Sequence, residues 1–239
     1  MAQSVLHKAD SRGGADHGWL KSYHTFSFAN YYNPARIQFG ALRVLNDDQI
    51  DGSTGFGEHP HDNMEIISIA LEGALQHEDS IGNVAVIAPG EIQVMSAGTG
   101  VYHKEFNHEA DKKAKFLQIW VFPNKRNVTP RYDQQSYDVD NRKNELVQIL
   151  SPSPEDDGAW IYQDAWFHIA KFDQNTSLSY NLHLKDNGVY VFVLKGTLIV
   201  DDQELSERDG LGIWDTDAIN IKASAGAELL LMEVPMQVQ

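Results

Sequence analysis

The sequence predicts an all-β protein made of two related units. Short apolar segments with strand character recur along the chain, roughly eight to twelve residues apart, with glycine- and proline-containing turns between them. No long amphipathic helix pattern competes with them. Two motifs of the first half also return in the second: Leu71-Glu-Gly73 as Leu194-Lys-Gly196, and Pro89-Gly-Glu-Ile-Gln-Val94 as Asp209-Gly-Leu-Gly-Ile-Trp214. These repeats indicate a degenerate internal duplication of a sandwich or small barrel.

Strands can be placed along the first half in order. Residues 9–33 are rich in aromatic side chains, which we interpret as core or domain packing, and residues 25–31 alternate as a strand would. Residues 39–48 form a second expected strand that ends in a polar turn at Asn46-Asp-Asp48. Further strands are expected over 64–71, 74–79, 83–87, 92–95 and 116–122.

Residues 123–165 change in character, because they are polar and contain prolines. Such a segment is typical of a connection between domains. From residue 165 the strand pattern resumes, over 180–184, 188–202, 210–214 and 227–235. The sequence therefore predicts a second β unit after the connection.

Composition excludes several classes of function. The chain of 239 residues is 42% hydrophobic, enough for a sizeable core, and it has no cysteine, which excludes disulfides, thiolate catalysis, Fe–S clusters and thiolate zinc sites. Its net charge of −15 disfavours direct binding of nucleic acid. The N-terminus lacks an apolar leader segment, and no apolar run reaches about 18 residues, so we expect a cytoplasmic protein that does not enter a membrane.

Two histidine-containing pairs in the first half predict a metal site. His59 and His61 are two residues apart on an expected strand, so their side chains face the same side, roughly 6.6 Å apart. His103 and Glu105 repeat this spacing on a later strand. Pairs on facing strands would offer three imidazoles and one carboxylate, donors that suit Fe(II), Mn, Ni, Cu or Zn. The second half has neither type of pair.

Each pair alone is a short motif with a false-positive risk, but glycines frame both of them. His168 and His183 in the second half are isolated, and we interpret them as ordinary hydrogen-bonded or surface histidines. The chemistry is therefore expected in the first unit.

The motifs resemble those of the cupin superfamily and, more closely, of the pirin family. The general cupin pattern is met by Gly55, His59, His61, Glu65, Gly73, Gly100, His103 and Asn107. Gly98 departs from it, since many cupins have proline there. The pirin-like segments are Arg12-Gly, His17-Gly-Trp19, Phe26-Ser-Phe28, Gly55-Phe-Gly-Glu-His-Pro-His61, Leu71-Glu-Gly73, His77-Glu-Asp79, Ser96-Ala-Gly-Thr-Gly100 and His103-Lys-Glu105. The resemblance covers residues 9–130 by motif and the rest by architecture.

Pirins are bicupins, so the resemblance implies two cupin-type β-barrels in one chain. It implies a metal-binding N-terminal domain over 1–130 and a degenerate C-terminal domain without a metal motif over 131–239. One divalent transition metal is expected, with Fe(II) first and Ni, Mn, Cu, Co or Zn as alternatives. The ligands implied are His59, His61, His103 and Glu105.

Two further residues remain open at this point. In most cupins the glutamate at the position of Glu65 coordinates the metal, so Glu65 is the rival of Glu105 and is otherwise expected to orient a ligand histidine. His77 belongs to a pirin-like segment, and we expect a structural role for it.

Bacterial pirin-like proteins of this type are associated with quercetinase activity. The resemblance therefore implies a quercetin 2,3-dioxygenase that acts on a flavonol, or on another small aromatic enol or catechol, with O2. Glu105 would be the catalytic group, taking the proton of the substrate hydroxyl. The alternatives are a metal-binding regulatory protein, acting as a transcription cofactor or enzyme modulator through protein partners, and a metal that only stabilises the barrel. We expect a monomer.

Overall fold

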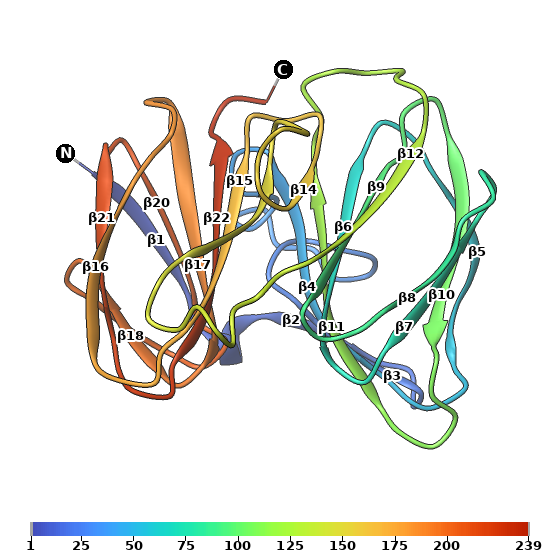
Figure 1. Ribbon diagram of the computed structural model, residues 1–239, viewed down its shortest axis with the longest axis horizontal. Coiled ribbons are helices and arrows are strands. Elements are labelled where there is room, and N and C mark those ends of the chain that lie inside the picture. Colours follow the sequence, from blue (N-terminus) through green and yellow to red (C-terminus); the bar gives the residue numbers. More distant parts are fainter. Residues whose placement is uncertain (1, 239) are drawn as a thin grey trace.

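The computed structural model describes residues 2–238, and its regular elements are β-strands apart from one 3-10 turn, η1 (Ala9–Ser11). Figure 1 shows two β-barrels side by side, with the first strand of the chain lying in the barrel that is otherwise C-terminal. The all-β architecture of two cupin barrels is therefore confirmed.

The barrel that carries the predicted site consists of eleven strands from the first half of the chain. They are β2 (Gly13–Asp16), β3 (Leu20–His24), β4 (Leu42–Ile50), β5 (Gly55–His61), β6 (Glu65–Glu72), β7 (Leu75–Asp79), β8 (Val84–Ile87), β9 (Glu91–Ser96), β10 (Val101–Asn107), β11 (Ala114–Val121) and β12 (Arg131–Ser136). These form one sheet in the order β12-β9-β6-β11-β4-β3-β2 and a smaller sheet in the order β5-β10-β7-β8.

The other barrel also has eleven strands. They are β1 (Gln3–His7), β13 (Val147–Ser151), β14 (Ala159–Trp160), β15 (Trp166–Lys171), β16 (Thr176–Asn181), β17 (Asn187–Lys195), β18 (Thr197–Val200), β19 (Gln203–Ser206), β20 (Gly210–Trp214), β21 (Ala218–Ala223) and β22 (Glu228–Pro235). The sheet orders are β1-β20-β17-β22-β15-β13-β14 and β16-β21-β18-β19, so each barrel pairs a seven-stranded with a four-stranded sheet.

The repeated Leu-x-Gly motif marks the same turn in both barrels. Gly73 follows β6 with φ +70°, and Gly196 follows β17 with φ +73°. This left-handed conformation favours glycine. A Cβ at Gly73 would also lie 2.8 Å from the carbonyl oxygen of Lys113. The motif that is repeated in the sequence thus forms a turn of the same backbone conformation in both barrels.

Two strand predictions were wrong. Residues 25–31 form an irregular loop with only one isolated bridge. The buried Phe26 packs between the barrels, and the backbone N–H groups of its neighbours Thr25 and Ser27 donate to different segments, to Leu45 on β4 and to Arg36. β4 continues through Asn46 and Asp48, where a polar turn was expected. These two side chains are buried because they face the interior of the barrel, which contains a cavity at this level.

Strand pairing crosses the expected domain division near residue 130. β1 runs antiparallel to β20, so the first strand belongs to the C-terminal sheet. β12 pairs with β9 and extends the N-terminal sheet beyond residue 130. The exact division stays a prediction, although most of each barrel comes from one half of the chain.

The apolar core has three parts. The largest cluster lies between the two seven-stranded sheets and contains side chains from β4, β6, β9 and β11 of one barrel and from β13, β15, β17 and β22 of the other. The interior of the C-terminal barrel is filled by a second apolar cluster. The interior of the N-terminal barrel has only two small apolar clusters, and buried polar side chains occupy other inward positions there. Burial of apolar area stabilises both interiors, and the N-terminal one contains a cavity.

Candidate metal centre

Three histidines converge in the N-terminal barrel. β5 and β10 run antiparallel with His59 opposite His103, and the Nε2 atoms of these two rings lie 2.9 Å apart. The ring of His61 lies 4.9 Å from that of His59 and 4.8 Å from that of His103. One ligand nitrogen from each histidine falls within 4.8 Å of the others. The two-residue spacing therefore places all three imidazoles around one point, as the sequence predicts.

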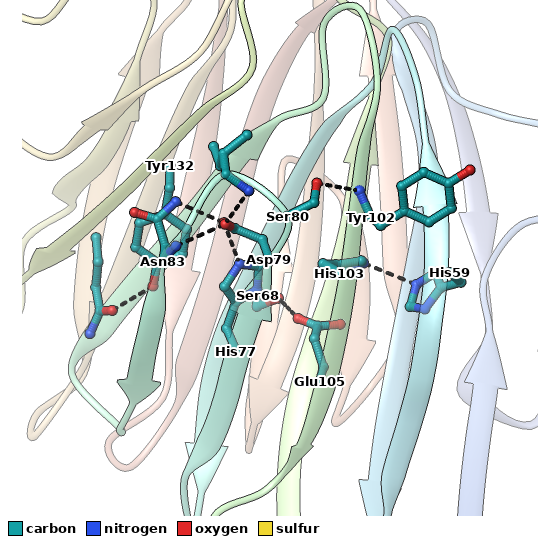
Figure 2. Close-up of polar contacts among 12 residues, drawn as sticks. His59, Ser68, His77, Asp79, Ser80, Asn83, Tyr102, His103, Glu105 and Tyr132 are labelled. Carbon is teal, nitrogen blue, oxygen red and sulfur yellow. Dashed lines mark hydrogen bonds and ion pairs between the residues drawn. The ribbon is translucent and has the colours of Figure 1, made fainter.

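Glu105 lies beside this cluster rather than within it. Its carboxylate forms a second group with His77 and His103, whose ligand atoms also lie within 4.8 Å of one another. Ser68 donates a hydrogen bond of 3.0 Å to Oε1 (Figure 2). Gln118 donates one of 2.7 Å to Oε2. Burial raises the pKa of Glu105. His103 is shared by both groups, so it is the residue that links the carboxylate to the other imidazoles.

The structure places His77 closer to the centre than expected. It is fully buried on β7 opposite Glu105, and its ring lies 5.3 Å from that of His103. Its Nε2 atom is 3.0 Å from Oδ2 of Asp79. Asn83 donates two hydrogen bonds to the same carboxylate, from its backbone N–H to Oδ1 and from its side-chain amide to Oδ2. Nδ1 of His77 has no protein partner. A carboxylate that fixes one nitrogen of an imidazole leaves the other as a directed donor, so His77 is a further candidate ligand.

The rival carboxylate, Glu65, lies elsewhere. It belongs to neither group of metal donors among the described residues and does not line the cavity beside them. Ser96 donates a hydrogen bond of 2.6 Å to its carboxylate, and the Arg131 guanidinium is nearby. Burial raises the pKa of Glu65 to about 7, although Ser96 and Arg131 oppose the shift. Of the two carboxylates, only Glu105 lies beside the imidazoles.

Replacing Glu65 with glutamine is expected to change the pH dependence of stability. The pKa of Glu65 is about 7 in the folded protein and ordinarily 4.5, so the folded state binds this proton more tightly. The wild-type protein should therefore lose stability as pH rises from 4.5 to 7, by on the order of 3 kcal/mol from this group. Glutamine does not ionise. Urea unfolding at several pH values would measure the free energy of unfolding of both proteins. The difference between them should shift in favour of the variant as the pH rises from 4.5 to 7, and a difference that does not change with pH would contradict the assignment.

Burial favours the neutral form of two of the three imidazoles. Burial and, to a lesser extent, neighbouring histidines lower the pKa of His61 to about 4 and that of His103 to about 2. Neutral imidazole is the form that binds metals, so no proton has to leave His61 or His103 at pH 7. Three imidazole nitrogen donors beside a buried carboxylate fit a divalent transition metal.

A cavity of about 230 Å³ adjoins the imidazoles. Aromatic and apolar side chains form much of its wall, among them Leu20, Phe28, Phe56 and Trp120, and the histidine cluster lies on one side. The polar residues lining the cavity are His17, Ser22, His24, Asn46, Asp48, His59, His61, His103, Glu105 and Gln118. A larger hollow of about 610 Å³ shares His59, His61 and Trp120 with it and extends past Pro60 and Tyr102.

Sequence reasoning missed His24, Asn46 and Asp48 as cavity residues. The available signal was their two-residue spacing, because Asn46 and Asp48 fall on the same side of the strand as the buried apolar residues Val44 and Ile50. Consecutive polar residues such as Asn46-Asp-Asp48 also suggest a turn. Because they were interpreted as a turn, their position on a strand that lines the cavity was not predicted.

Two barrels of this kind in one chain make the protein a bicupin. A family model described as Pirin matches residues 5–121, and one described as Quercetinase C-terminal cupin domain matches residues 148–234. The chain belongs to the pirin family.

Relatives match over nearly the whole chain. A protein named quercetin 2,3-dioxygenase from Escherichia coli (strain K12) is 42% identical over 96% of this chain and 98% of its own length. A pirin-like protein from Caulobacter vibrioides is 40% identical over 94% of this chain and 96% of its own. The crystal structure of bacterial pirin YhhW from E. coli in complex with nickel(II) has a TM-score of 0.92 at 40% identity, covering 99% of this chain and 100% of that one.

None of the helical structure described over residues 2–238 is long and apolar enough to cross a membrane.

Proposed function

We propose that this protein is a metal-dependent dioxygenase of the quercetin 2,3-dioxygenase type. One observation carries the proposal: three imidazoles and a buried carboxylate lie together at the wall of an aromatic-lined cavity. Residues His59, His61 and His103 would hold the metal, with Glu105 as the fourth ligand and His77 as its competitor. The name of the E. coli relative, and the nickel(II) in the YhhW structure, support this assignment.

The metal would be Fe(II) first, with Ni, Mn, Cu, Co and Zn as alternatives, because N/O ligand sets of this kind accept several divalent ions. When bound, such an ion supplies Lewis acidity toward an enol oxygen and an open position for the reactants. The reaction is the addition of O2 to a flavonol with ring opening and release of carbon monoxide.

Glu105 is the residue we assign to proton transfer. Its burial raises its pKa, so it holds a proton more readily than an exposed carboxylate does. Ser68 and Gln118 fix both carboxylate oxygens, which orients the group for transfer from a substrate hydroxyl. Small movements of the Gln118 amide would release one oxygen to accept that proton.

The cavity wall has the second role. Phe28 and Trp120 meet edge to face at 5.4 Å, and Trp120 meets His61 in the same way at 5.0 Å. These rings shield the metal centre from water and offer flat surfaces to an aromatic substrate. Exclusion of water limits side reactions of an activated substrate.

The proposal predicts oxygen-dependent bleaching of quercetin. Protein loaded in turn with iron, manganese, nickel, copper or cobalt is mixed with quercetin, and the flavonol absorbance is followed in air and under nitrogen. At least one metal should give turnover in air, with carbon monoxide released in proportion, and none should do so under nitrogen. Failure of every metal in air would refute the dioxygenase assignment.

A further inference from the structure

A row of buried polar side chains crosses the interior of the N-terminal barrel. Ser68 on β6 lies in register with Gln118 on β11. Gln118 lies in register with Asn46 on β4, and Asn46 with His24 on β3. All four are at most 8% exposed. Residues in register on adjacent strands have side chains on the same face of the sheet, so the row forms one continuous polar strip.

The two ends of the strip differ in how they are bonded. At one end, Ser68 and Gln118 donate their hydrogen bonds to Glu105, next to the metal centre. At the other end, Oδ1 of Asn46 and Nδ1 of His24 are buried and have no protein partner. Buried polar atoms are nearly always paired with protein, water or ligand, so these atoms point to something that binds beside them.

Asp48 adds a third unpaired atom to this end. It lies two residues beyond Asn46 on β4, on the same face, and is 4% exposed. Its Oδ1 atom also has no protein partner, and all three residues line the cavity that adjoins the histidines. A carboxylate or amide oxygen accepts hydrogen bonds, and Asp48 can accept one in either protonation state.

An aromatic wall connects this end of the cavity to the metal centre. Phe28 contacts His24 at a ring separation of 5.2 Å and Trp120 at 5.4 Å, and Trp120 contacts His61 at 5.0 Å. A flat ring lying along this wall would have the imidazoles near one edge and the three unpaired atoms near another. The cavity volume of about 230 Å³ is below the roughly 300–1,000 Å³ of sites for drug-sized ligands, so the enclosed part suits a single ring.

We propose that His24, Asn46 and Asp48 form a hydroxyl-binding subsite, so that the substrate is an aromatic compound with ring hydroxyl groups as well as the oxygen that meets the metal. The hydroxylated ring enters the cavity and donates hydrogen bonds to Asn46 and Asp48. The rest of a larger molecule extends past His59, His61 and Trp120 into the outer hollow. This inference deepens the proposed function, because it takes the metal centre as the other attachment point.

The test uses two ligands that share the same metal-binding unit. Quercetin and 3-hydroxyflavone both carry the 3-hydroxy-4-keto group, but only quercetin has hydroxyl groups on its benzene rings. Nickel-loaded protein is titrated with each under nitrogen, so that no turnover occurs, and binding is followed by tryptophan fluorescence. The wild type should bind quercetin at least about 10-fold more tightly, since a site with unpaired acceptors rejects a ligand that lacks the donors.

Asp48→Leu should weaken quercetin binding about 10-fold and leave 3-hydroxyflavone binding within about twofold, because only the hydroxylated ligand uses the acceptor. The matched variant Asp48→Asn keeps an oxygen acceptor of the same size and should retain most of the preference. Nickel content of each variant reports whether the barrel has folded around its centre. A change in the shape of the cavity alone would weaken both ligands equally.

Equal affinity of the wild type for both ligands, or an equal loss of both in Asp48→Leu, would overturn the subsite. Its failure is separate from failure of the dioxygenase proposal. If binding prefers quercetin through Asp48 but quercetin is not bleached in air, the subsite is supported and the dioxygenase reaction is rejected. If quercetin is bleached in air but the protein binds both ligands equally, the reaction is supported and the subsite is rejected.

Discussion

Replacing His103 with alanine is expected to lower metal affinity by at least about 100-fold and to abolish any quercetin turnover. Even residues that only orient a ligand usually change affinity 10- to 100-fold, and His103 is a direct candidate donor. It is also the one residue common to the two donor groups, so its loss leaves neither of them complete. Competition titration with a chromophoric chelator would measure the affinity of the wild type and the variant for nickel.

His183→Ala is the control for this experiment. His183 lies in the C-terminal barrel, where its ring stacks on Trp166 at 4.3 Å and its Nδ1 atom is 3.0 Å from Glu233. This is the ordinary hydrogen-bonded histidine that the sequence predicts. The control should bind nickel as tightly as the wild type. If His103→Ala also kept its nickel, the metal centre would have to be sought elsewhere.

Replacing Glu233 with alanine is expected to destabilise the C-terminal barrel by about 3–5 kcal/mol. Glu233 is fully buried, and its carboxylate accepts hydrogen bonds from the Tyr180 hydroxyl, the backbone N–H groups of His183 and Leu184, and the Asn187 amide. Truncation would leave buried donors without partners and remove the anchor of the loop before β17. Urea unfolding followed by circular dichroism would measure the change.

Glu228→Ala on the same strand is the matched variant. Glu228 is only half-buried at the start of β22, so its loss should cost less than about 1 kcal/mol. Neither variant should alter nickel affinity in the N-terminal barrel. A Glu233→Ala protein as stable as Glu228→Ala would show that the buried hydrogen bonds contribute no net stability.

The two-residue spacing of His59 and His61, with His103 on a facing strand, was enough to predict that the imidazoles meet. It could not predict where the Glu105 carboxylate lies relative to the three rings, because that depends on the strands with which β10 pairs. β10 keeps a regular register with β7, which places Glu105 opposite His77, whereas the extra residue of β5 leaves Glu105 opposite Phe56. The carboxylate lies to one side of the histidine cluster, where it accepts a hydrogen bond from Ser68.

The fold was predictable to the extent that local signals define it. Turn glycines such as Gly73 and Gly196 marked the duplicated hairpins, and short apolar segments between turns marked many of the strands. The polar residues Asn46 and Asp48 were misread because a strand that lines a cavity breaks the usual link between polarity and exposure. The pairing of β1 with β20 could not be predicted, since pairing between segments distant in the sequence leaves no local pattern.

That long-range pairing bears on how the chain is made. Gln3 lies opposite Trp214, so β1 must wait for roughly 200 further residues, about 10–40 s of synthesis, before its partner strand exists. During that interval the N-terminal barrel can fold while β1 stays undocked. Docking of β1 on β20 is then a late event in folding, and it joins a segment that precedes the N-terminal barrel to the barrel that is synthesised last.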